Sequence, residues 1–161
     1  MKSLKQEIKS QLLAKTESEL QAAEEALRST QSLVRDGDLK SDGKYDTRGI
    51  EAGQLAGAQE KRVEELKLEL QLLEELPVRE LRADDEAALG ALLTIETAGV
   101  ARRYYLASTA GGTMIRVGDE TLLVISVFSP LGDAVLGLRA GEEFECEVGG
   151  KDRSYKLLAL C

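Results

Sequence analysis

The chain of 161 residues contains no histidine and no tryptophan, and it has only two cysteines and two prolines. Without histidine, Ser-His and Cys-His catalysis and histidine-containing metal sites are excluded. The two cysteines, Cys146 and Cys161, are too few for a thiolate zinc site and suggest no disulfide framework. No signal peptide or long apolar run is found, so we expect a cytoplasmic protein without membrane contact.

The charge balance also excludes one class of partner. The formal net charge is -8, and aromatic residues make up only 4% of the chain. A cut after Glu80 leaves 13 basic and 17 acidic residues before it, and 8 and 12 after it, so each part carries -4. Because broad neutralisation of nucleic-acid phosphates needs clustered Lys and Arg, we do not expect that mode of binding.

Two long helical patterns occupy the first half of the chain. The first runs from Lys2 to about Val34 without Pro or Gly, and the second runs from about residues 45–49 to Leu76, where Pro77 ends it. Each carries one narrow stripe of apolar or small residues on an otherwise polar helix, which indicates a coiled-coil partner. The stripes are Leu4, Ile8, Leu12, Thr16, Leu20, Ala23, Leu27, Thr30 and Val34, then Ala52, Ala56, Gln59, Val63, Leu66, Leu70 and Leu73.

The segment between these patterns, residues 35–46, is acidic and contains Gly37 and Gly43. Because glycine commonly ends helices, we expect an antiparallel hairpin rather than one long helix in a parallel dimer. The predicted organisation is an α+β protein: a coiled-coil hairpin over 1–76 with its acidic tip at 35–46, a linker over 77–83, and a second domain over 84–161.

The second domain reads as a small, mainly antiparallel β domain. Asp84, Asp85 and Glu86 suggest a short helical or irregular segment, and a short helix is expected over 131–138. The predicted strands are 92–95, 103–107, 112–117, 122–127, 143–148 and 155–160, separated by glycine-containing turns. Glutamates alternate with Phe144, Cys146 and Val148, which predicts one covered and one wet face of the sheet.

Two motifs lie on these elements. At the predicted tip, Gly37-Asp38-Leu39-Lys40 is followed by Tyr45. In the second domain, Ile125-Ser126-Val127-Phe128-Ser129-Pro130 is followed by Ala134, Leu136 and Gly137. The first motif resembles the tip motif of the Gre family of bacterial transcription elongation factors, and the second resembles the Ser-Pro turn and short helix of that family's FKBP-like domain. The architecture covers nearly the whole chain, and the motifs cover about a quarter of it.

The resemblance implies a partner and a shared metal. In the family, the hairpin enters the secondary channel of RNA polymerase and the globular domain grips the rim of the channel. The tip carboxylates then help the polymerase hold a second Mg²⁺ and position water, so that backtracked RNA is cleaved. Mg²⁺ prefers oxygen ligands, and a two-metal site generates hydroxide near neutral pH. The protein would be a monomer and no enzyme by itself, with no cofactor of its own and indirect contact with nascent RNA.

Carried over by position, the resemblance assigns Asp38 as the first tip acid. The family's second acid, a Glu three residues later, is Ser41 here, and Asp42 follows it as the expected second carboxylate and Mg²⁺ ligand. Supporting tip residues are Asp36, Lys40, Ser41, Tyr45 and Asp46, and the polymerase-contact residues are Phe128, Ser129 and Pro130.

Other interpretations of the same residues stay open. Asp36 and Asp38 also suit a turn, Asp42 or Asp46 suits a cap of the second helix, and Ser129-Pro130 suits an ordinary turn. Four tip aspartates also resemble the family's inhibitory members, which occupy the channel without promoting cleavage. From other classes, an FKBP-like prolyl isomerase or chaperone and a coiled-coil adaptor are the alternatives.

Overall fold

The computed structural model describes residues 2–40 and 47–161, with the side chains of 37–40 and 47–48 outside the description. Its contacts divide the chain into two units, residues 14–71 and residues 1–13 together with 72–161. Two N-terminal helices are followed by a six-stranded sheet, so the predicted α+β class is confirmed. The boundaries at residues 76 and 83 stay a prediction of domain organisation.

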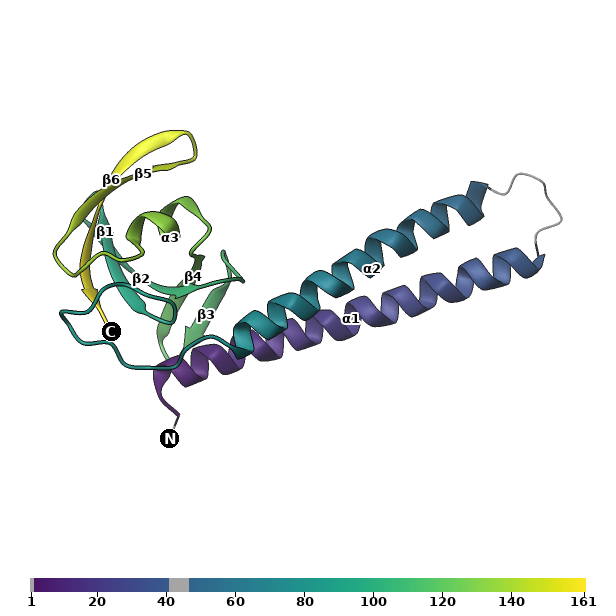
Figure 1. The fold of residues 1–161 in the computed structure, drawn as a ribbon, viewed down its shortest axis with the longest axis horizontal. Coiled ribbons are helices and arrows are strands. Elements are labelled where there is room, and N and C mark those ends of the chain that lie inside the picture. Colours follow the sequence, from purple (N-terminus) through teal and green to yellow (C-terminus); the bar gives the residue numbers. More distant parts are fainter. Residues whose placement is uncertain (1, 41–46) are drawn as a thin grey trace. The chain divides into compact units, whose positions relative to one another are not determined.

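The unit of residues 14–71 contains most of the helices α1 (Leu4–Lys40) and α2 (Thr47–Glu74), which lie side by side (Figure 1). The predicted stripes are confirmed, since every residue of both is buried or half-buried. Arg62 of α2 reaches Glu19 of α1 at 3.9 Å, and Gln31 of α1 reaches Glu60 at 3.5 Å. Glu19 precedes Gln31 along α1, whereas Arg62, which contacts Glu19, follows Glu60, which contacts Gln31, along α2. The two helices therefore run antiparallel.

Helix α1 is longer than predicted. We expected it to end near Val34 because Gly37 follows, but the helix continues through Gly37 to Lys40. A glycine inside a helix costs only about 1 kcal/mol relative to alanine, which the flanking helical residues offset. Residues 35–40, predicted to begin the tip, are therefore helical in their backbone.

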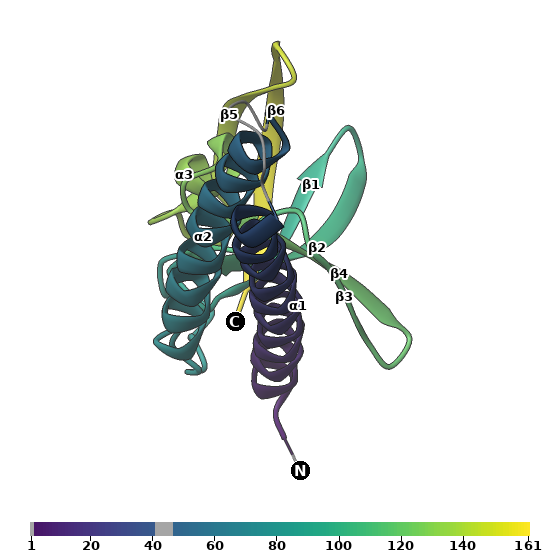
Figure 2. The same ribbon diagram turned by 90° about the vertical axis from the view of Figure 1, so that its right-hand side faces the viewer.

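The other unit contains a sheet with the strand order β3-β4-β2-β1-β6-β5. Neighbouring strands are antiparallel except for β2 and β4, which are parallel. Figure 2 shows the β1–β2, β3–β4 and β5–β6 hairpins ending at separate points. The strands are β1 (Leu92–Thr97), β2 (Val100–Ala107), β3 (Met114–Val117), β4 (Glu120–Ser126), β5 (Glu143–Val148) and β6 (Lys151–Leu160).

Both faces of the central strands are covered, so the prediction of one wet face was wrong for this part of the sheet. Along β2, Tyr104 and Leu106 belong to one core, which also includes Val135 of the short helix α3 (Pro130–Val135). Tyr105 and Ala107 belong to the opposite core, which the ends of α1 and α2 cover. The glutamates of β5 are exposed, so the expected pattern is found at that edge.

Two lysines of α1 fasten the end of α2 and the segment after it. The ammonium of Lys9 donates to the carbonyls of Glu74 at 2.7 Å and Leu76 at 2.8 Å. Lys5 is 1% exposed and donates to the carbonyl of Arg79 at 2.7 Å. Burial lowers the pKa of the Lys5 ammonium. Since α2 has no basic residue in its own last turn, Lys9 supplies the positive charge that its C-terminal carbonyls favour.

Candidate functional site

Most of the predicted tip lies outside the residues that the structure describes. Ser41, Asp42, Tyr45 and Asp46 lie outside the described residues. The backbone of Asp38 and Lys40 lies in the last turn of α1, and their side chains are outside the description. Asp36 is exposed on α1, so it is a helical residue and not the turn residue of the alternative interpretation.

The predicted contact turn is built around Ser129. Its hydroxyl donates to the carbonyl of Ser126 at 2.6 Å and accepts from the backbone N–H of Gly132 at 3.1 Å. Ser129 is thus the N-cap of α3, with Pro130 following in the first turn, where its missing N–H costs nothing. The Ser-Pro pair is a helix start rather than an ordinary turn.

Gly132 holds α3 close against the end of β4. A Cβ at this position would lie 1.8 Å from the carbonyl oxygen of Ser126 and 3.1 Å from the hydroxyl of Ser129. No larger residue fits without movement of the backbone, since non-bonded carbon and oxygen atoms need more than 3 Å. The close approach leaves the turn between Ser126 and Gly132 little freedom.

This turn presents Phe128 to solvent. Phe128 is 82% exposed, the largest exposed fraction among the exposed large apolar side chains of the described residues. Its backbone N–H donates to the hydroxyl of Ser126 at 3.1 Å, which fixes the base of the side chain. Leu136, at the other end of α3, is 43% exposed. An exposed aromatic on a rigid turn suits a partner contact, because burying such a ring stabilises a complex by roughly 1.5–3 kcal/mol.

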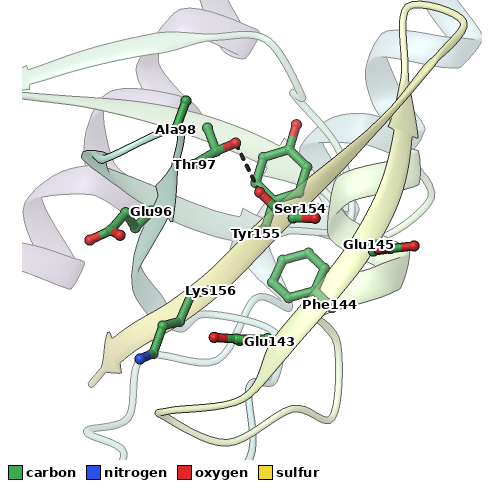
Figure 3. Close-up of a pocket in the computed structure, with 9 residues that line it drawn as sticks. All are labelled: Glu96, Thr97, Ala98, Glu143, Phe144, Glu145, Ser154, Tyr155 and Lys156. Carbon is green, nitrogen blue, oxygen red and sulfur yellow. Dashed lines mark hydrogen bonds between the residues drawn. The ribbon is translucent and has the colours of Figure 1, made fainter.

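A hollow of about 450 Å³ lies over β5, β6 and the end of β1. The rings of Phe144 and Tyr155 stack there with centroids 5.4 Å apart (Figure 3). The hydroxyl of Thr97 donates to the carbonyl of Ser154 at 3.0 Å and ties β1 to β6. The charged residues that line the hollow are Glu96, Glu143, Glu145 and Lys156. The sequence pattern placed Phe144 on one face of its strand, but it contained no signal that paired Phe144 with Tyr155.

Within residues 2–36 and 49–161, no group of three or more Cys, Asp or Glu residues could hold a metal ion. Cys146 is buried, as its pattern predicted, and burial raises the pKa of its thiol, which makes it a poor nucleophile. None of the helices in the described part is both long and apolar enough to cross a bilayer.

No protein-family model and no curated protein matches the chain. Among solved structures, it is similar to GreA factor homolog 1 (Gfh1) of Thermus thermophilus, at 20% identity over 92% of this chain and 94% of that chain, with a TM-score of 0.40. It is similar to Thermus aquaticus Gfh1 at 21% identity over 91% of this chain and 92% of that chain, with a TM-score of 0.40. A prokaryotic transcription elongation factor GreA/GreB from Nitrosomonas europaea is 20% identical over 54% of this chain and 64% of that chain, with a TM-score of 0.35.

Proposed function

We propose that this protein is a Gre-like regulator of bacterial RNA polymerase that acts through the secondary channel. The tip of the hairpin delivers Asp38 and Asp42 to the catalytic Mg²⁺ of the polymerase, and the cleavage of backtracked RNA is stimulated. The chemistry takes place in the polymerase, so the protein is a donor of ligands and has no cofactor of its own. One observation carries the proposal: the Gly-Asp-Leu-Lys motif occupies the last turn of a long helix, so Asp38 lies two residues before the end of α1.

The helical setting supports this role for a physical reason. A ligand donor must reach a site inside another protein, and a helix of 37 residues is about 55 Å long at 1.5 Å per residue. The antiparallel partner α2 buries the apolar stripe of α1 within the unit of residues 14–71. A pair of helices keeps its end residues in place far better than a free loop of the same reach would.

The test is transcript cleavage by backtracked RNA polymerase, with and without the protein. Asp38→Asn removes one carboxylate and keeps its size. We expect stimulation to fall at least 10- to 100-fold, since even residues that only support metal ligands contribute that much. Binding to the polymerase should stay within about twofold, because a tip ligand adds little contact area. Glu51→Gln, an exposed acid on α2, is the matched control. Unchanged cleavage by Asp38→Asn would contradict the mechanism.

One residue favours a second candidate function, which also acts on RNA polymerase. Ser41 stands where the family has its second tip acid, and a hydroxyl is a weaker Mg²⁺ ligand than a carboxylate. In this alternative the protein occupies the channel and inhibits the polymerase without promoting cleavage. RNA shortening in the same assay supports stimulation, and slowed elongation without shortening supports inhibition.

The contact through the globular unit is tested separately. We propose that Phe128, on the turn between Ser126 and the Ser129 cap of α3, packs against the rim of the channel. Phe128→Ala should weaken binding to core polymerase roughly 5- to 30-fold, the effect of losing an aromatic anchor worth about 1–2 kcal/mol. Met114→Ala is the matched control, since Met114 is 62% exposed on β3 of the same unit. Equal binding by the two variants would place the contact elsewhere.

A further inference from the structure

Strand β5 forms one edge of the sheet, and it is longer than β3 at the other edge. The backbone N–H of Leu157 on β6 donates to the carbonyl of Glu142 at 3.0 Å. In an antiparallel pair, successive residues alternate between bonding the neighbour and facing away from it. Counting from Glu142, the backbone groups of Phe144, Cys146 and Val148 therefore face β6. Those of the residues between them face the free edge.

The residues at that free edge are Glu143, Glu145 and Glu147, and all three side chains are exposed. No ion pair of theirs is found within the described chain. Figure 3 shows Glu145 pointing away from β6. Across the pair, Lys156 lies opposite Glu143, and Asp152 lies opposite Glu147, so the row is strongly acidic overall.

The opposite face of the same edge is apolar. Phe144 and Val148 are half-buried beside the buried Cys146, and they pack on the core that includes α3. A strand placed along β5 would set every second side chain beside the glutamates and the others beside Phe144 and Val148. The edge thus specifies both the backbone and the side-chain pattern of an added strand.

We propose that the β5 edge binds an extended peptide segment in which Lys or Arg alternates with apolar residues. The segment adds as an antiparallel strand to the sheet and takes its hydrogen bonds from the backbone of Glu143, Glu145 and Glu147. Its basic side chains pair with the three carboxylates. Its apolar side chains cover the exposed parts of Phe144 and Val148.

A second copy of this chain is a poorer occupant. Two β5 strands paired antiparallel would place glutamates opposite glutamates, and like charges in that position are destabilising. The acidic row therefore opposes self-association through an open edge, as charged edge residues commonly do. It favours a basic strand for the same electrostatic reason.

The experiment uses the full chain, labelled with ¹⁵N, and the peptide Ac-Lys-Val-Lys-Val-Lys-NH₂. When the peptide is added, we expect the changes in the protein's amide chemical shifts to concentrate on residues 143–148. The scrambled peptide Ac-Lys-Lys-Val-Val-Lys-NH₂ should bind at least roughly fivefold more weakly, since it cannot satisfy both faces of the edge. Glu145→Gln should weaken binding roughly two- to fivefold through the lost charge pair. Glu145→Pro should weaken it about fivefold further, because proline removes the outward-facing donor and is tolerated at edge strands.

A charge exchange keeps the test decisive if the proline variant does not fold. With Glu143, Glu145 and Glu147 all changed to Lys, the basic peptide should lose binding and Ac-Glu-Val-Glu-Val-Glu-NH₂ should gain it. Equal binding of the alternating and scrambled peptides, or the absence of shift changes in 143–148, would overturn the proposal. So would a failed charge exchange in a folded triple variant. None of these readouts uses RNA polymerase, so their failure is separate from a failure of the proposed function.

Discussion

The close approach at Gly132 gives a prediction whose size follows from the geometry. In Gly132→Ala, the new Cβ would lie 1.8 Å from the carbonyl oxygen of Ser126, so α3 must move away from β4. Overpacking of this kind costs about 1–3 kcal/mol, and loss of the Ser129 cap adds about 1 kcal/mol. We expect a loss of about 2–4 kcal/mol from the free energy of unfolding. At about 5 °C per kcal/mol for a unit of about 100 residues, the melting temperature falls by roughly 10–20 °C.

Near-UV circular dichroism is the suitable assay, because Tyr104, Tyr105 and Tyr155 all lie in the sheet of the unit that contains Gly132. The matched control is Gly57→Ala. Gly57 lies within α2, and a Cβ there would meet nothing within 4 Å. That exchange should stabilise α2 by about 0.5–1 kcal/mol, read at 222 nm, since alanine loses less backbone entropy in a helix. A Gly132→Ala melting temperature within about 2 °C of wild type would refute the reasoning.

Two further predictions concern the ends of the helices and the sheet core beside them. Lys9→Met removes the two hydrogen bonds to the carbonyls of Glu74 and Leu76. It should lower the free energy of unfolding, measured by urea denaturation, by about 1–2 kcal/mol. Lys2→Met, at an exposed lysine, is the control, and an equal loss from it would contradict the capping role of Lys9. Tyr105 is fully buried and its hydroxyl has no partner, and burial raises its pKa to about 12. Because the tyrosine of the unfolded chain ionises first, near pH 10, the free energy of unfolding should fall as the pH rises from about 10 to 12. Tyr105→Phe should remove this pH dependence without loss of stability at pH 7. The same fall of stability with pH in the variant would contradict the prediction.

Periodicity predicted much of the fold correctly. The helical stripes contain Thr16, Thr30 and Gln59 among apolar residues, yet their spacing alone identified the buried side of each helix. The strand predictions also hold, because β-branched and aromatic runs separated by glycine turns leave few alternatives. Pattern reasoning failed at Gly37, where a local preference for ending the helix is weaker than the propensity of the residues around it.

The candidate site, too, could be predicted only in part from the sequence. The motifs around Asp38 and Phe128 are local, so the sequence alone identifies them as features to test. The exposure of Phe128 and the cap that Ser129 forms depend on how α3 meets the end of β4, which spacing does not encode. The outward direction of the Glu145 backbone depends on the register between β5 and β6.

By itself, the sequence determined the classes of residue and their periods: two amphipathic helices, an acidic connection, a glycine-punctuated β region and no histidine chemistry. The tertiary structure decided which of these elements meet. It covered both faces of the central strands, placed Lys5 and Lys9 on carbonyls at the end of α2 and just after it, and left β5 at an edge. The reason is that a period is set by the local backbone, whereas pairing and burial are set by contacts between residues far apart in the chain.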